Sequence, residues 1–281
     1  MVSVKNLVKR YGDFCLEVSL EIPDGMVTGL IGKNGAGKST VIKSILGLVK
    51  PDSGSVCVFG KEAGKLSPKE KEKIGVALSD SGFSNYLTLE DVTKILCKMY
   101  EDFNESEFRT LCKSQGLPFD KDLKNFSTGM KAKVKVLVAL SHKADLLIMD
   151  EPTSGLDIEA RNEILDIMRD YLEENERCSI LITSHISSDL EGLCDDIYMI
   201  HEGKMILHEE TDKIMGQYGL LKMDEAMYAR LDKSNIIKTK KTDYGYECFT
   251  SEKQFYIDNY PGLVVENGNI DDLILMMTGG K

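Results

Sequence analysis

The stretch Gly32-Lys33-Asn34-Gly35-Ala36-Gly37-Lys38-Ser39 decides the fold of this chain. It fits the pattern G-x-x-x-x-G-K-[ST], whose glycines let backbone N–H groups turn inward around phosphate oxygens. A short apolar run over 27–31 precedes it, and apolar residues at helical spacing follow over 41–49. A buried strand that ends in this loop and leads into a helix predicts a site for nucleotide phosphates.

Each part of this loop has an expected role at a bound nucleotide. The Lys38 ammonium should reach the β- and γ-phosphates, and the Ser39 hydroxyl should hold Mg²⁺. The positive end of the helix that follows is aimed at the same anion. The other residues expected to contact the nucleotide are Gly32, Asn34, Gly35, Ala36, Gly37 and Thr40. We therefore predict that the chain binds ATP together with Mg²⁺.

A second apolar strand is predicted over 146–149, and it ends in two carboxylates. Asp150 is expected to hold Mg²⁺ opposite Ser39, and Glu151 to act as the general base toward the attacking water. His185 closely follows another predicted strand, 180–183. A histidine there can hydrogen-bond the γ-phosphate or orient the water, although a lone histidine at a strand end is also compatible with an ordinary surface residue. Glu151 and His185 complete a predicted catalytic set with Lys38, and Asp150 is a predicted ligand of the metal.

The segment Phe126-Ser127-Thr128-Gly129-Met130-Lys131 resembles the signature of ABC-transporter ATPase subunits, whose common form is L-S-G-G-Q. Ser127 and Gly129 match the serine and the second glycine of that form, and the intervening and flanking positions depart from it. The resemblance implies that both residues close, in trans, over ATP held by a second subunit. Taken alone, Ser127 also has the position of an N-cap for the helix that follows.

Other positions follow the order of the same family. Residues 154–157 resemble the loop that crosses its dimer interface, and Tyr11 stands where its adenine-stacking aromatic is found; a half-exposed strand tyrosine is the alternative for Tyr11. The family's glutamine after the strand at 74–78 is replaced by Ser79 or Asp80. Both side chains are shorter than glutamine, so we expect Ser79 to make a weaker or water-mediated contact with Mg²⁺.

Strands that alternate with helices predict an α/β fold with a mostly parallel sheet covered on both faces. The resemblance implies a P-loop NTPase core of the ABC type in residues 1–219, with an antiparallel β subdomain and a helical subdomain at about 80–125. Short strand-like and helical stretches then follow in residues 220–281. They predict a small C-terminal α+β accessory region, to which no motif assigns a chemistry.

Composition narrows the class of protein. The 281 residues include 35 basic and 46 acidic side chains, and the resulting net charge of −11 argues against a protein built to grip nucleic acid. The seven cysteines show no C-x-x-C spacing, so neither a zinc site nor a disulfide framework is expected. No apolar run approaches the roughly 18–20 residues that span a bilayer. We expect a soluble chain whose membrane contact is made through a partner.

These observations together predict an ATP-hydrolysing subunit that works as a homo- or heterodimer and powers a separate transmembrane permease. The Ser-Thr-Gly-Met-Lys segment and the C-terminal region resemble small bacterial exporters of the ABC-2 type, which implies export of peptides, antibiotics or other amphiphiles at the cytoplasmic face of the membrane. The alternative is a soluble ABC-type ATPase with a regulatory, ribosome-linked or DNA-linked role. Ribosomal members carry two motif sets, whereas one set is present here.

Overall fold

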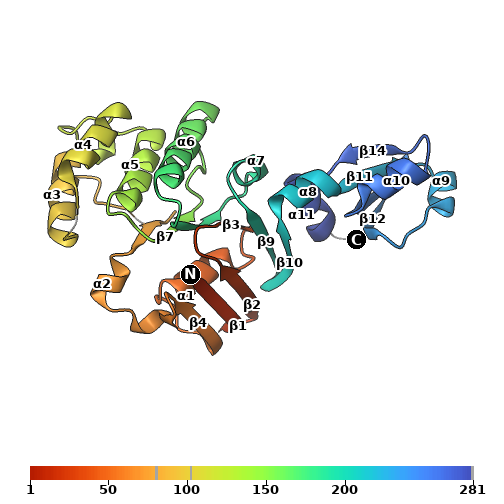
Figure 1. Ribbon diagram of the computed structural model, residues 1–281, viewed down its shortest axis with the longest axis horizontal. Coiled ribbons are helices and arrows are strands. Elements are labelled where there is room, and N and C mark those ends of the chain that lie inside the picture. The colour runs from red at the N-terminus through yellow and green to blue at the C-terminus, as the bar shows by residue number, and fades with distance from the viewer. Residues whose placement is uncertain (80–81, 102, 280–281) are drawn as a thin grey trace.

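The computed structural model describes residues 1–79, 82–101 and 103–279. Its main element is a ten-stranded sheet with the order β5-β4-β1-β2-β10-β9-β3-β8-β7-β6 (Figure 1). Its strands are β1 (Val2–Tyr11), β2 (Phe14–Ile22), β3 (Val27–Ile31), β4 (Ser53–Val58), β5 (Lys61–Glu62), β6 (Ile74–Ala77), β7 (Leu146–Asp150), β8 (Ser179–Thr183), β9 (Asp196–His201) and β10 (Lys204–Glu210). The sheet has a parallel half, from β9 to β6, and an antiparallel half, from β2 to β5.

The parallel half is buried on both faces. Successive residues of a strand point to opposite faces, so Leu147 and Met149 of β7 join one apolar cluster while Leu146 and Ile148 join another. Helices α5 (Thr128–Leu140) and α6 (Ile158–Glu174) cover the first face, and α1 (Lys38–Ile45) covers the second. The double cover explains the continuous apolar runs and agrees with the predicted α/β class.

The antiparallel half continues the same sheet. Strands β1, β2 and β4 pair in antiparallel fashion. They are joined to the parallel half through β10, which lies between β2 and β9. The ladder at this junction contains one pair, Lys204 with Glu17. The antiparallel subdomain expected from the sequence is therefore joined to the parallel core by a narrow seam.

A helical part packs over α5 at the upper left of Figure 1. It contains α3 (Leu89–Met99) and α4 (Glu105–Ser114), which lie within the range 80–125 expected for a helical subdomain. Thr88 and Asp91 form a reciprocal capping box at the start of α3, and the Asn104 side chain caps α4. Such caps satisfy the N–H groups that the first turn of a helix leaves unpaired.

The chain after residue 218 builds a second sheet, at the right of Figure 1, with the order β12-β13-β11-β14. Its elements are β11 (Gly219–Met223), α9 (Glu225–Arg230), β12 (Ile236–Thr242), β13 (Gly245–Thr250), α10 (Lys253–Asn259) and β14 (Val264–Asn267). A separate apolar cluster here is built on the buried residues Leu221, Leu231, Cys248 and Tyr256. The edge strand β12 carries three lysines, Lys238, Lys240 and Lys241. We call residues 219–279 the tail.

The last helix of the tail, α11 (Ile270–Thr278), returns toward the main sheet. The remaining elements are η1 (Ala63–Lys65), α2 (Pro68–Lys71), η2 (Leu123–Asn125), α7 (Ser187–Glu191) and α8 (Thr211–Gln217). In the part of the chain that the structure describes, every helix is too short or too polar to cross a membrane.

Candidate nucleotide site

The phosphate loop joins the end of β3 to the start of α1. Gly37 has a left-handed backbone with φ of 116°, and a Cβ there would lie 2.7 Å from the Cδ1 atom of Leu16. A Cβ on Gly32 would lie 2.3 Å from the carbonyl oxygen of Ile200. A side chain at either glycine would therefore push the loop off the sheet.

Lys38 reaches back across this loop. Its side chain is almost completely buried, and its Nζ atom donates a hydrogen bond of 2.6 Å to the carbonyl oxygen of Gly32. The same nitrogen lies 3.7 Å from Oε1 of Glu151. The ammonium thus stands between the phosphate loop and the end of β7, as the predicted contact with the β- and γ-phosphates requires.

Asp150 ends β7 and is held by two hydroxyl groups. Its Oδ1 atom accepts a hydrogen bond of 2.7 Å from Thr183 Oγ1, and its Oδ2 atom accepts one of 3.0 Å from Ser79 Oγ. Carboxylate and hydroxyl oxygens are the ligands that Mg²⁺ prefers, and Ser39 lines the same cleft, so this set of side chains fits Mg²⁺. The Ser79 hydroxyl contacts the predicted metal-binding carboxylate. Asp80, the alternative position, lies outside the described residues.

Glu151 has a backbone conformation that is unusual for a residue with a side chain, with φ of 52°. Its N–H group donates to the carbonyl oxygen of Thr183 at 3.1 Å and to the Thr183 hydroxyl at 3.0 Å. A left-handed conformation costs about 1–2 kcal/mol for such a residue, and the paired strand end compensates for it. The result is a carboxylate directed at Lys38 on one side and at His185 on the other.

His185 contacts this carboxylate through both backbone and ring. Its backbone N–H donates to Oε2 of Glu151 at 3.3 Å, and its Nδ1 atom makes a close hydrogen bond to the same oxygen. The imidazole remains about half exposed. His185 and Glu151 therefore form one hydrogen-bonded pair, and the role of His185 at a γ-phosphate stays a prediction.

These residues line one cleft of about 470 Å³. Its lining residues are Phe14, Lys33, Asn34, Gly35, Gly37, Lys38, Ser39, Thr40, Ser79, Asp150, Glu151, Ser154 and His185. Gly32 and Ala36 belong to the same loop, but both residues are buried. Within the described part of the chain, Tyr11, Ser127 and Gly129 do not line this cleft.

The aromatic side chain in the cleft is Phe14, which faces Tyr11 across the β1–β2 hairpin. The Tyr11 ring is about half exposed, and Lys9 Nζ lies 5.7 Å from its centre. The expected adenine contact of Tyr11 stays a prediction. Phe14 is a second aromatic residue at this site. The sequence motifs did not indicate it, although it lies only three positions after Tyr11.

Ser127 caps α5, since its Oγ atom accepts a hydrogen bond of 3.2 Å from the N–H group of Met130. Gly129 lies against α6, because a Cβ there would lie 3.0 Å from the Cβ atom of Ala160. The cap predicted from the sequence is confirmed. Contact of this segment with a nucleotide on a second subunit stays a prediction.

A buried acidic residue that the motifs did not indicate braces the two loops that carry Glu151 and His185. Asp189 is completely buried, and it accepts hydrogen bonds from Thr153 in the loop after β7 and from Ser184 in the loop after β8. Arg161 of α6 pairs with its other carboxylate oxygen. This network fixes the loops that carry Glu151 and His185, and it depends on residues brought together only by the fold.

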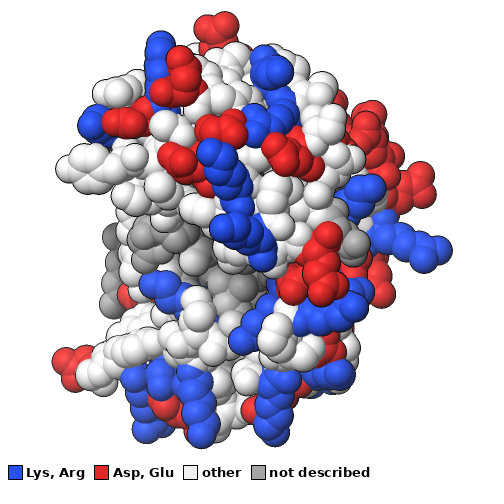
Figure 2. Space-filling model, turned by 90° about the vertical axis from the view of Figure 1, so that its left-hand side faces the viewer, with Lys and Arg blue, Asp and Glu red and all other residues white. Residues whose placement is uncertain are grey.

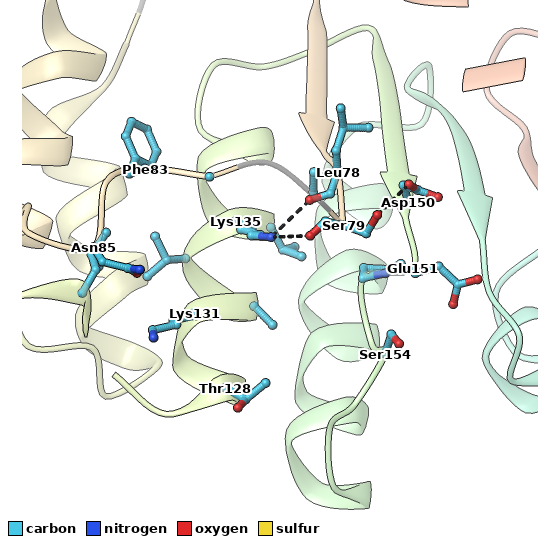
Figure 3. A pocket seen from close by; sticks show the side chains of 17 residues that line it. Leu78, Ser79, Phe83, Asn85, Thr128, Lys131, Lys135, Asp150, Glu151 and Ser154 are labelled. Atoms are coloured by element: carbon cyan, nitrogen blue, oxygen red, sulfur yellow. Dashed lines mark hydrogen bonds between the residues drawn. The ribbon is translucent and has the colours of Figure 1, made fainter. Parts of the chain in front are cut away.

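A second cleft, of about 650 Å³, lies on the other side of Asp150 and Glu151 (Figure 3). Lys135 of α5 extends across it, and its Nζ atom donates to the carbonyl oxygens of Leu78 and Ser79, each at 3.2 Å. Lys135 therefore links α5, the helix that begins at the signature-like segment, to Ser79, one of the two residues that can stand in the place of the family's glutamine.

Comparison with known proteins agrees with this geometry. The family model described as "ABC transporter" matches residues 15–154. A lantibiotic transport ATP-binding protein of Streptococcus pyogenes is 38% identical over 216 residues, which cover 75% of this chain and 92% of that protein. This chain belongs to the ABC transporter family. It is an ATP-binding and ATP-hydrolysing subunit of that family, as its sequence predicted.

Other members support the same assignment. A linearmycin resistance ATP-binding protein of Bacillus subtilis is 38% identical over 214 residues, covering 73% of this ABC subunit and 68% of the relative. A solved ATP-binding subunit of an ABC transporter is 29% identical, with a TM-score of 0.68, and covers 77% of this chain and 92% of its own. The predicted family and fold are confirmed.

Proposed function

We propose that this ABC subunit powers a separate transmembrane permease that exports peptide antibiotics or related amphiphiles. The observation that carries the proposal is the cleft in which Lys38, Asp150 and Glu151 converge. It is accompanied by the similarity to a lantibiotic transport protein and to a linearmycin resistance protein. The chain would lie on the cytoplasmic face of the membrane, held there by its permease.

The proposed chemistry is in-line attack of water on the γ-phosphate of ATP, in which the bond to the bridging oxygen breaks and ADP leaves with inorganic phosphate as the other product. Lys38 and the loop N–H groups would neutralise the phosphate oxygens, and Glu151 would accept the proton of the attacking water. The His185 contact keeps the Glu151 carboxylate oriented in the cleft. Ser39 and Asp150 would hold Mg²⁺, with the Ser79 hydroxyl hydrogen-bonded to Asp150, and the ion would supply neutralisation of phosphate charge.

We further propose that two subunits pair when ATP is bound. The support is that Ser127 and Gly129 do not line the cleft of their own subunit and lie at the start of α5. The N-terminus of a helix presents N–H groups that can bind an anion. In a pair, this helix end would face the γ-phosphate held by the partner.

The permease contact is proposed at the second cleft. Figure 2 shows the face of the molecule hollowed between the helical part above and the antiparallel strands below, with acidic and basic side chains interspersed around it. A cytoplasmic segment of the permease that entered near Lys135 would press on the end of β6 and on the Asp150 wall. This route would connect transport to hydrolysis.

The test is Mg²⁺-dependent ATP hydrolysis by the purified subunit over a range of protein concentrations. Glu151→Gln should lower the rate about 10²–10⁴-fold, because the general base is lost, and should leave ATP binding intact. Glu173→Gln, an equal charge change at an exposed position of α6, is the control and should keep the wild-type rate. Specific activity that rises with concentration supports the paired subunits.

Equal rates for wild type and Glu151→Gln would refute the role of Glu151. The export proposal is tested separately, by comparing cells that carry wild-type or Glu151→Gln subunit for growth in amphiphilic peptide antibiotics and in a small hydrophilic antibiotic. Sensitivity confined to the peptides supports the proposed cargo class. Recovery of rRNA or DNA, in place of a membrane protein, with the purified subunit would favour the soluble alternative.

A further inference from the structure

Helix α11 belongs to two parts of the molecule at once. It closes the tail in sequence, and Figure 1 shows it between the tail sheet and the ten-stranded sheet. Its buried side chains, Ile270, Leu273 and Met276, join the apolar cluster that covers the first face of the main sheet. The same cluster includes Leu190 of α7. The helix is therefore fixed to the ATPase core by its apolar face.

The amino end of α11 is attached next to the catalytic histidine. The N–H group of Ile270 donates a hydrogen bond of 3.0 Å to Oε1 of Glu191. Glu191 is the last residue of α7, and α7 begins two residues after His185. The position of α11 is thus tied to the loop that carries His185.

The carboxyl end of α11 is attached to the phosphate loop. Lys33 Nζ donates a hydrogen bond of 3.2 Å to the carbonyl oxygen of Thr278. The last carbonyl groups of a helix have no partner within the helix and carry the negative end of its dipole, so an ammonium is a favourable partner there. Lys33 also lines the nucleotide cleft.

We propose that α11 is a strut that sets the phosphate loop at its distance from the His185 loop, and that Lys33 is the positioning residue through which it does so. Because coupling between two sites is reciprocal, ATP in the cleft would in turn hold α11 in place and so report nucleotide occupancy to the tail. The proposal rests on ATP binding at the phosphate loop and is independent of the permease and its cargo.

A competing explanation gives Lys33 a direct role. Its side chain lines the cleft, so its charge could act on the phosphates without any help from α11. The two explanations differ at Glu191, which contacts only the far end of α11 among the hydrogen bonds described and does not line the cleft. If α11 acts as a strut, loosening either of its ends should raise KM for ATP in the same way.

The experiment combines Lys33→Met, Glu191→Ala and the double variant, with Lys33→Arg and Glu191→Gln as controls that keep a donor and an acceptor. Lys33→Met should raise KM for ATP about two- to tenfold, the range expected for one net hydrogen bond, with little change in kcat. Glu191→Ala should raise KM in the same direction, and the double variant should be less than additive. The two controls should restore most of the loss.

Hydrogen exchange gives a readout that does not depend on hydrolysis. Amides of residues 275–279 should exchange faster in Lys33→Met, and addition of a non-hydrolysable ATP analogue should slow them in the wild type. If Lys33→Met raises KM while α11 exchanges normally and Glu191→Ala has no effect, Lys33 acts on the phosphates alone and the strut is refuted. Unchanged KM in both variants also refutes it.

Discussion

The main sheet and the tail sheet differ in how their faces are covered. The parallel half of the main sheet is covered on both faces by helices of the ATPase core, and its strand ends carry the loops that line the nucleotide cleft. In the tail, residues that are adjacent in sequence pack in different clusters. Leu221 and Cys248 belong to the tail's own cluster, whereas Leu220 and Phe249 belong to the cluster on the first face of the main sheet. Part of the apolar core of the tail is therefore shared with the main sheet. We conclude that the tail folds against the ATPase core.

The largest expected effect is on the polar brace of the main sheet. Asp189→Ala would leave Arg161 without its carboxylate partner and release the loops bearing Glu151 and His185. Removing one member of a buried ion pair costs about 3–5 kcal/mol of unfolding free energy. Urea unfolding measures this cost, and ATP hydrolysis at low temperature should fall in the same variant. Normal stability would mean that the brace contributes little to the core.

A pair of leucine substitutions compares the two faces of the tail. Leu273 of α11 and Leu221 of β11 are both fully buried, so Leu→Ala at each should cost about 2–5 kcal/mol. Leu273→Ala should weaken ATP binding as well, since it loosens α11, whereas Leu221→Ala should leave KM near the wild-type value. Equal effects of the two variants on KM would contradict the separation of the two clusters.

The smallest expected effect concerns helix caps within the ATPase. Ser127→Ala and Asn104→Ala each remove one side-chain cap, from α5 and α4, and each should cost about 1 kcal/mol of stability. Thermal unfolding should show similar shifts for both. Hydrolysis at high protein concentration should fall for Ser127→Ala only, because Ser127 has the proposed contact with the partner's nucleotide. If Ser127→Ala and Asn104→Ala lose ATP hydrolysis to the same extent, the lower stability of the variants explains the effect of Ser127→Ala.

Local patterns predicted the parts of the site that lie within one stretch of chain. The phosphate loop, the two carboxylates at the end of β7 and the Ser127 cap each depend on neighbours a few residues away, and the structure has them in the expected elements. The roles predicted for these residues at bound ATP and Mg²⁺ remain predictions. The boundary between residues 219 and 220 falls one residue inside β11, which begins at Gly219, and it is likewise a proposal as a domain limit.

The features that sequence reasoning did not identify depend on distant partners. Asp189 resembles any acidic residue of a short helix until the fold brings Thr153 and Arg161 to it. Helix α11 was expected as part of an accessory region, and its contact with Lys33 joins residues 245 positions apart. Strands β9 and β10 had a local signal in the sequence, because Gly203 lies between two apolar runs. In the structure Glu202 and Gly203 both have a left-handed backbone, as a tight hairpin requires.

The lysines on the outer edge of β12 bear on how this subunit behaves when it is crowded. An exposed edge strand offers unpaired N–H and C=O groups to any identical strand nearby, and such pairing leads to aggregation. A second copy approaching β12 would bring its own Lys238, Lys240 and Lys241 against the same three cations. Electrostatic repulsion therefore discourages sheet extension at this edge, which leaves association to surfaces whose charges are complementary.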